Sequence, residues 1–257
     1  MSSKQCLNCG NELSNKFCCQ CGQKADTHRI TLRHFIEHDL LHGVFHIEKG
    51  ILFTVKETFT RPGKAAMDYI NGKRISYYNI FYLLLLLVGF NLLVMHYIKE
   101  FSDTAGVLKA DKDGVKILNF INANIKYLIL SFIPLFAFNG WLMFRRLKLN
   151  IAEHHIVSGF VLLGCALIAL VYNLLLLLPV SWQDGGFVYL ELALTALLFL
   201  FPVYVYYMAF GPQYKIAGFT LRMMAMYVLF SIEMLILLLI AIVLISKGSF
   251  DGALELA

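Results

Sequence analysis

Charged side chains are scarce in this sequence. Asp, Glu, Lys and Arg together make up 15% of its 257 residues, whereas hydrophobic residues make up 59%. A soluble globular domain averages about 25% charged and roughly 45–50% apolar residues. One water-facing core could not bury so much apolar surface, so the composition excludes a cytosolic globular enzyme. It equally excludes a disordered chain and a disulfide-stapled secreted miniprotein.

Several catalytic signatures are also missing. The sequence contains no G-x-x-x-x-G-K-[ST] phosphate loop, no G-x-S-x-G nucleophile elbow and no H-E-x-x-H zinc-protease helix. Basic residues ahead of the first apolar run are interleaved with acids, 11 against 7. This mixture suits anionic lipid better than a dedicated nucleic-acid groove, and nucleic-acid binding stays a minor alternative.

Five long stretches are almost free of charge. About 20 apolar residues in a helix cross the hydrocarbon core of a bilayer, and continuous rather than alternating apolarity favours helices over barrel strands. We therefore predict an all-α fold, a polytopic membrane bundle of about five transmembrane helices. They lie near Tyr77–Ile98, Ile125–Phe144, His155–Pro179, Phe187–Phe210 and Met223–Ile245. Two of these spans contain a proline, Pro134 and Pro202, which should kink them.

Lys and Arg are distributed unequally between the two sides of the predicted bundle. The N-terminal side carries 16 of them and the opposite side 6. Because basic loops remain in the cytoplasm, we expect the N-terminus in the cytoplasm. The chain then divides into residues 1–25, a cytoplasmic juxtamembrane segment 26–76, and the bundle 77–257.

The sharpest motif precedes the first apolar run. Cys6 and Cys9 form one C-x2-C pair, and Cys18 and Cys21 form a second. Two such pairs separated by a short loop allow four thiolates to converge tetrahedrally on one Zn²⁺, whereas disulfides conflict with a reducing cytoplasm. We therefore predict a zinc ribbon over residues 1–25. Its Zn²⁺ should be structural, because four thiolates leave no coordination position open for substrate.

The juxtamembrane segment is predicted to be helical and amphipathic. Apolar residues recur at three- and four-residue steps, at Leu32, Ile36, Leu40, Val44, Ile47, Ile51, Val55 and Phe59. This stripe should rest on the bilayer surface or on the cytoplasmic ends of the spans. Arg61-Pro62-Gly63 ends the helix, and Lys64–Asn71 forms a further short helix that Gly72 stops.

Histidines recur at four-residue spacing on the opposite face of the same helix, at His34, His38, His42 and His46. Imidazoles at i and i+4 can share a metal ion, or respond to pH near neutrality. The next cytoplasmic loop offers Glu153 and His154 at the same depth, so both segments together could form a second metal or pH site. The alternative is a polar helix face whose histidines rest near headgroups.

Glu233 lies near the middle of the last predicted span. A lipid-facing carboxylate is costly, so Glu233 should face protein or a water cavity. Its candidate hydrogen-bond partners are Asn91, Asn139, Tyr172 and Asn173. Such a residue suggests a proton or ion path, and it is equally compatible with a role in holding helices together.

Four basic residues bracket the short helix at the expected headgroup level. They are Arg61, Lys64, Lys73 and Arg74. Contact with anionic lipid headgroups is the simplest account of this arrangement.

The order of these features resembles one uncharacterised bacterial family of zinc-ribbon multi-pass membrane proteins, domain of unknown function 3667. The resemblance rests on the segments CLNCG…FCCQCGQ, RITLRHFIEHDL and EKGILFTVKETFTRPGKAAMDYINGKRISYYN, which precede a multi-span region. Glu153-His154 is a further shared feature. The resemblance implies the architecture in the bacterial inner membrane, and the family has no established activity to carry over.

We therefore interpret the chain as a non-enzymatic integral inner-membrane protein. Its zinc-bound cytoplasmic head would dock a protein partner in an assembly, scaffold or regulatory role, and its other contacts would be the bilayer and anionic headgroups. Two alternatives stay open. One is a small transporter or channel that uses Glu233, and the other is a membrane-surface metalloenzyme that uses the histidine row with Glu153 and His154.

Overall fold

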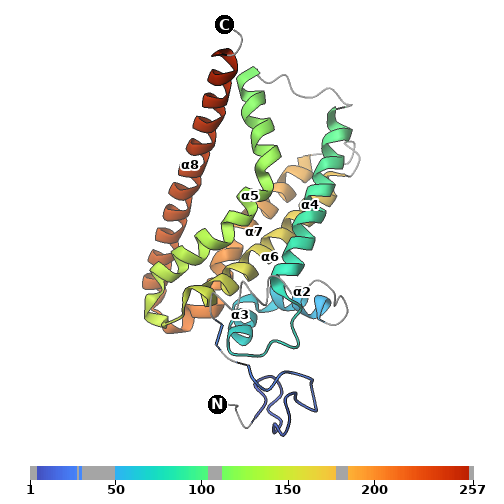
Figure 1. The fold of residues 1–257 in the computed structure, drawn as a ribbon, viewed down its shortest axis with the longest axis vertical. Coiled ribbons are helices and arrows are strands. Elements are labelled where there is room, and N and C mark those ends of the chain that lie inside the picture. The colour runs from blue at the N-terminus through green and yellow to red at the C-terminus, as the bar shows by residue number, and fades with distance from the viewer. Residues whose placement is uncertain (1–4, 28, 31–49, 104–111, 178–184, 255–257) are drawn as a thin grey trace.

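The fold is a bundle of long helices with a small N-terminal head at one end (Figure 1). The computed structural model describes residues 5–27, 29–30, 50–103, 112–177 and 185–254. Their helices are α2 (Ile51–Thr60), α3 (Pro62–Ile70), α4 (Ile80–Asp103), α5 (Lys112–Met143), α6 (Ile151–Leu176), α7 (Gly185–Phe210) and α8 (Ile216–Leu254), with the 3-10 turns η2 (Arg145–Leu147) and η4 (Gly211–Gln213). The head adds two isolated β-bridges. The all-α prediction is confirmed.

Four helices are long and apolar enough to cross a membrane. The candidate spans are Ile80–Ile98, Ile151–Leu176, Gly186–Gln213 and Ile216–Ile240. The α8 window has a mean hydropathy of 2.4, yet only 11% of it is buried within the protein. Because so large an apolar surface would be unfavourable in water, these helices indicate that the chain is a membrane protein. A shorter apolar stretch, Ile129–Met143, lies in α5, and the predicted count of five spans stays a prediction.

Three helices begin earlier than the predicted spans that they contain. The helix α5 begins at Lys112 rather than near Ile125, α6 at Ile151 rather than near His155, and α8 at Ile216 rather than near Met223. The charge of Glu153 suggests a loop in the sequence, but its carboxylate closes the first turn of α6. Glu153 accepts a hydrogen bond from the backbone N–H of Asn150 at 2.8 Å, and the Asn150 side chain accepts one from the N–H of Glu153 at 2.9 Å, which is a capping box.

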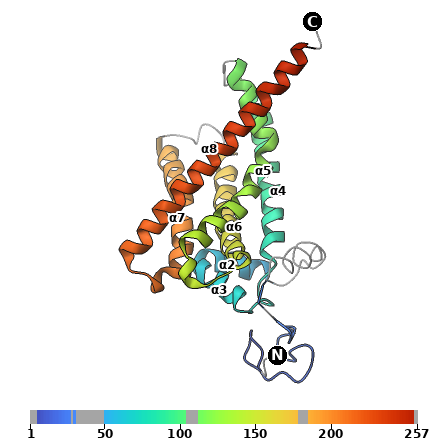
Figure 2. The same ribbon diagram turned by 60° about the vertical axis from the view of Figure 1, so that its left-hand side comes forward.

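The centre of the bundle is α6. It contacts α3, α4, α5 and α7, and it lies in the middle of the bundle in Figure 1. Its buried side chains include Ile156, Val157, Phe160, Val161 and Leu163. In contrast, α8 packs on α5 at the edge of the bundle (Figure 2). The direction of α5 changes along its length (Figure 1), as expected of a helix that contains Pro134.

The short helix α2 buries polar residues beside the predicted apolar stripe. It buries Thr54, Glu57 and Thr58 against the protein, and the stripe residues Ile51 and Val55 are partly buried and pack against the hydrophobic core. Leu52, which is outside the stripe, is 85% exposed, and the stripe residue Phe59 is also exposed. The exposed apolar side chains suit a helix that lies in the membrane interface. The rest of that stripe, from Leu32 to Ile47, lies outside the described residues.

The helix end at Arg61 and the helix that follows it agree with the sequence. Arg61 separates α2 from α3, and Pro62 occupies the first position of α3, where its missing N–H costs nothing. The helix ends at Ile70, and Gly72 follows with a φ of 101°. That left-handed conformation explains why glycine stops the helix.

Candidate metal centre and the head–bundle junction

Four cysteine sulfurs converge in the head. The Sγ atoms of Cys6 and Cys21 are 3.6 Å apart, those of Cys9 and Cys18 are 3.5 Å apart, and all four lie within 4.8 Å of one another. Four thiolates on one Zn²⁺ at about 2.3 Å would stand about 3.8 Å apart. A disulfide would need about 2.05 Å, so the four residues are free thiols that could hold one metal ion.

The two C-x2-C segments have the same backbone conformation. The N–H of Gly10 donates to the carbonyl of Cys6 at 2.8 Å, and the N–H of Gly22 donates to that of Cys18 at 2.9 Å. Both glycines have a φ of 76°, which other residues rarely adopt. The backbone N–H of Cys21 lowers the pKa of the Cys18 thiol to about 7. The backbone of Asn11 lowers the pKa of Cys9, but desolvation and the neighbouring thiols outweigh it and raise this pKa to about 12.

The described residues bring together no second group of three metal-ligating side chains. His34, His38, His42 and His46 lie outside the described residues. Both Glu153 and His154 are buried, and both oxygens of Glu153 are already bonded to protein donors. The second metal or pH site therefore stays a prediction.

Gln23 joins the head to the connection between α3 and α4. This side chain is 4% exposed. Its Nε2 donates to the carbonyl of Gly72 at 2.8 Å, and its Oε1 accepts from the N–H of Arg74 at 3.2 Å and of Ile75 at 3.4 Å. A buried amide with both ends bonded to backbone fixes the orientation of two segments as well as their distance. The segment after Cys21 is therefore attached to the connection between α3 and α4.

A second joint links the head to α6. Arg29 donates from Nε and Nη2 to the two oxygens of Glu153, at 2.6 and 2.7 Å, and from Nη2 to the carbonyl of Lys148 at 2.9 Å. This hydrogen bonding raises the pKa of Arg29. Next to it, Asn150 donates to the carbonyl of Ile30 at 2.9 Å, and the Ile30 side chain is buried in the hydrophobic core.

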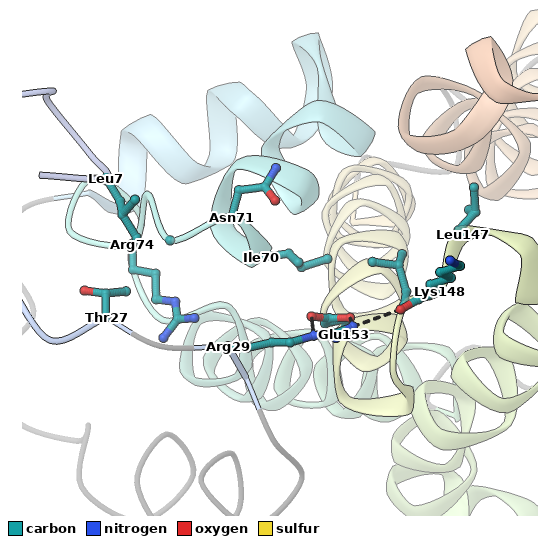
Figure 3. Close-up of a pocket in the computed structure, with 11 residues that line it drawn as sticks. Leu7, Thr27, Arg29, Ile70, Asn71, Arg74, Leu147, Lys148 and Glu153 are labelled. Atoms are coloured by element: carbon teal, nitrogen blue, oxygen red, sulfur yellow. Dashed lines mark hydrogen bonds and ion pairs between the residues drawn. The ribbon is translucent and has the colours of Figure 1, made fainter. Parts of the chain in front are cut away.

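Between these joints lies a cavity of about 450 Å³ (Figure 3). Its lining comes from the head, from the end of α3 with the turn after it, and from the connection between α5 and α6. The lining residues are Leu7, Thr27, Arg29, Ile70, Asn71, Gly72, Arg74, Leu147, Lys148, Leu149 and Glu153. The cavity is thus shared by the head and the membrane bundle.

Asp68 binds two of the four basic residues predicted to contact lipid. Arg61 donates to Asp68 at 3.1 Å and Lys73 at 2.9 Å. Arg61 also pairs with Glu57 at 2.5 Å, which raises the pKa of Arg61. The hydroxyl of Tyr77 donates to Glu57 at 3.4 Å, and burial raises the pKa of Tyr77. These bonds join α2, α3 and the following turn, and contact of the four basic residues with lipid stays a prediction.

Gly63 lets α3 touch α7 directly. A Cβ on Gly63 would overlap the carbonyl oxygen of Val205 and the backbone nitrogen of Ala209, and it would stand 2.7 Å from the Cβ of Met208. Nearby, the hydroxyl of Tyr204 donates to the carbonyl of Thr60 at 3.0 Å. Each residue of the Arg-Pro-Gly sequence therefore has its own role. Arg61 forms ion pairs, Pro62 begins α3, and Gly63 allows α3 to contact α7 closely.

Within the bundle, Asn139 of α5 donates to Glu233 of α8 at 2.8 Å. Asn139 was one of the candidate partners named for Glu233. Of the other three, Asn91 and Asn173 bond to each other and Tyr172 bonds to Glu191. His154 is also fully buried, and neither of its ring nitrogens has a hydrogen-bond partner among the described residues. The bundle therefore contains the Asn139–Glu233 pair, the Asn91–Asn173 pair and His154 among its apolar side chains.

Sequence reasoning missed the residues of the two joints. Gln23 and Arg29 follow the cysteine motif without any periodic or spacing signal that marks them. Asn150 could have been found, since Asn followed three residues later by Glu ahead of an apolar run is a helix-start signature.

The fold and the cysteine cluster together define a polytopic helical membrane protein with a cysteine-rich head. A family model described as "protein of unknown function (DUF3667)" matches residues 48–90. This segment contains α2, α3 and the start of α4, and the predicted resemblance to that family is confirmed over it. No curated protein and no solved structure matches the chain.

Proposed function

We propose that this chain is a non-enzymatic protein of the bacterial inner membrane, with a zinc-bound cytoplasmic head that docks a protein partner in an assembly, scaffold or regulatory role. Zinc is favoured because four thiolates in tetrahedral reach suit it. The basic N-terminal side supports the cytoplasmic orientation. A cluster closed by four thiolates keeps no position for substrate, which supports a structural role.

The observation that carries this proposal is the attachment of the head. Gln23 and Arg29 hold it to two different parts of the bundle, so a partner bound to the head would be held in a defined position relative to the membrane. The head also exposes an aromatic residue beside the metal site, since Phe17 is 59% exposed. Aromatic side chains are enriched where proteins bind each other, and Phe17 is the residue that we expect a partner to cover.

The test compares co-purification in native detergent with metal quantification. The full chain should carry one equivalent of zinc and a partner, and Phe17→Ser should lose the partner while it keeps the zinc. Leu52→Ser is the matched control, because Leu52 is an exposed apolar residue of α2 rather than of the head. A partner retained equally by both variants, or by a chain that lacks the head, would contradict the proposal.

The hydrogen bond between Asn139 and Glu233 favours a second candidate function, a small transporter or channel. A half-buried carboxylate held by an amide, in a bundle that also buries His154 without a partner among the described residues, is an arrangement typical of proton or ion paths. Flux in liposomes that disappears in Glu233→Gln would support this function. Equal flux in Glu191→Gln and Glu233→Gln, or no flux at all, would exclude it.

A further inference from the structure

The cavity at the head–bundle junction has a lining that selects the charge of its ligand. Its ionic residues are three cations and one carboxylate: Arg29, Arg74, Lys148 and Glu153. The carboxylate is already neutralised, because Glu153 is bonded to Arg29 at both oxygens and to a backbone N–H, and its side chain is only 3% exposed. The remaining charge of the lining is positive, so an anionic ligand is favoured.

Two guanidinium groups are placed to serve such a ligand. Arg29 uses Nε and Nη2 for Glu153 and Lys148, and the contacts described for it leave Nη1 for a ligand. Arg74 lies at the other side of the cavity. Its backbone N–H donates to Gln23, its Nε donates to the carbonyl of Tyr69 at 3.4 Å, and its guanidinium stands 5.8 Å from the centroid of the Tyr69 ring. Figure 3 shows its side chain extending toward the side where Thr27 and Arg29 lie.

Arginine and phosphate match in geometry as well as charge. A guanidinium presents parallel N–H donors that fit two oxygens of one phosphate, which a point charge cannot do. Lys148, in a left-handed turn with φ of 56°, adds positive charge from a third segment. A site built from three separate segments would bind an anion more selectively than a single exposed basic residue.

The size and the apolar part of the lining define the ligand further. The cavity of about 450 Å³ lies within the roughly 300–1,000 Å³ of small-molecule sites, and is larger than an inorganic ion requires. Its other walls include Leu7, Ile70, Leu147 and Leu149. This combination fits an anionic group that carries a short carbon skeleton.

We propose that this cavity binds a phosphate ester, held by Arg74 and Arg29 and bridging the head to the bundle. Both the headgroup of an anionic phospholipid and a soluble glycerol phosphate have this chemistry. The cavity lies at the end of the bundle where the spans meet the head, so either source can reach it. The proposal is independent of the docking function, since it concerns what is bound between the head and the spans rather than what binds outside the head.

The test uses the full metal-loaded chain and two probes. Glycerol 3-phosphate is titrated in a neutral detergent, and phosphatidylglycerol is added to nanodiscs otherwise made of phosphatidylcholine, with retention measured by native mass spectrometry. Binding of the soluble ester supports the proposal and identifies a soluble source. Selective retention of phosphatidylglycerol alone supports it with a lipid source.

Variants separate the cavity from general surface charge. Arg74→Gln should weaken binding at least tenfold. Arg74→Lys should weaken it less, because it keeps the positive charge and loses only the parallel N–H donors of the guanidinium. Lys56→Gln is the matched control, since it removes one exposed positive charge of α2 outside the cavity, and it should bind normally. If Arg74→Gln does not fold, Lys148→Gln and Arg74→Lys give the same comparison. Absence of binding to both probes, or equal loss in Lys56→Gln, would overturn the proposal.

Discussion

Arg29 and Glu153 meet across the junction between the head and the bundle, 124 residues apart in the sequence, with two hydrogen bonds of 2.6 and 2.7 Å. One carboxylate thereby does two things, because Glu153 also closes the first turn of α6. The position of the head and the start of the central span are coupled through a single side chain. Removal of the Glu153 side chain is therefore expected to affect both the attachment of the head and the first turn of α6.

Replacement of this carboxylate should loosen the head. In Glu153→Gln the ion pair with Arg29 is lost, whereas the amide oxygen can still accept from the N–H of Asn150 and keep the capping box. Because Arg29 is 59% exposed, water can solvate it once it is unpaired, so we expect a loss of about 1–2 kcal/mol rather than unfolding. Thermal unfolding in detergent measures the loss, and Glu191→Gln is the control. Unchanged stability and unchanged proteolysis near residue 29 would contradict the expectation.

Gln23→Ala tests the other joint. It removes a buried amide that bonds to the carbonyl of Gly72 and to the N–H groups of Arg74 and Ile75. Because the N–H of Arg74 also donates to the carbonyl of Gly72 at 3.0 Å, we expect a total loss of about 1–3 kcal/mol. We expect faster hydrogen exchange in residues 71–76 while the cysteine site keeps its metal. Gln20→Ala, at an exposed position between Cys18 and Cys21, should change neither quantity. Identical exchange in both variants would show that Gln23 does not hold the head.

The contact between α3 and α7 predicts a strong effect of one methyl group. Gly63→Ala would place a Cβ on the backbone of Val205 and Ala209, and backbone cannot move aside as a flexible side chain can. We expect a loss of about 1–3 kcal/mol, seen as a lower unfolding temperature. Gly89→Ala is the matched control, since a Cβ at Gly89 meets nothing within 4 Å; it should be neutral or slightly stabilising. Equal effects of the two substitutions would refute the close contact.

The cysteine cluster predicts a stoichiometry. The full chain should bind one metal ion, Cys9→Ser should lose most of it, and Cys165→Ser should retain it because Cys165 lies in α6, far from the cluster in sequence. Since thiolates must be deprotonated to bind, the metal should be released progressively as the pH is lowered. Metal quantification across a pH series measures this. Full metal retention in Cys9→Ser would mean that the four sulfurs do not form the site.

The boundaries that sequence predicted well are those with a local cause. The end of α2 before Pro62 and the stop of α3 before Gly72 depend on ring geometry and on a positive φ, which are properties of single residues. The start of α6 was misjudged because Glu153 was interpreted as a loop charge, although Asn150 and Glu153 together form a local capping-box signature. The pairing of Glu153 with Arg29 could not be predicted in this way, because Arg29 is distant in the chain.

The same distinction holds for α2. Its apolar periodicity indicated Ile51 and Val55, which pack against the hydrophobic core, but it did not indicate Thr54, which is fully buried. The Thr54 hydroxyl accepts the backbone N–H of Tyr78 at 2.8 Å, a contact that periodicity cannot reveal. In a membrane protein the apolar face of a helix need not face protein, since lipid can cover it equally well.

The amino-acid sequence by itself determined the helical membrane class and the four-thiolate cluster, because both follow from the local spacing of apolar residues and cysteines. Only the tertiary structure decided that Gln23 and Arg29 attach the head, that Asn139 is the partner of Glu233, and that Arg29, Arg74 and Lys148 line one cavity. These pairings join segments far apart in the chain, and their geometry is set by how the helices pack rather than by any short stretch of sequence.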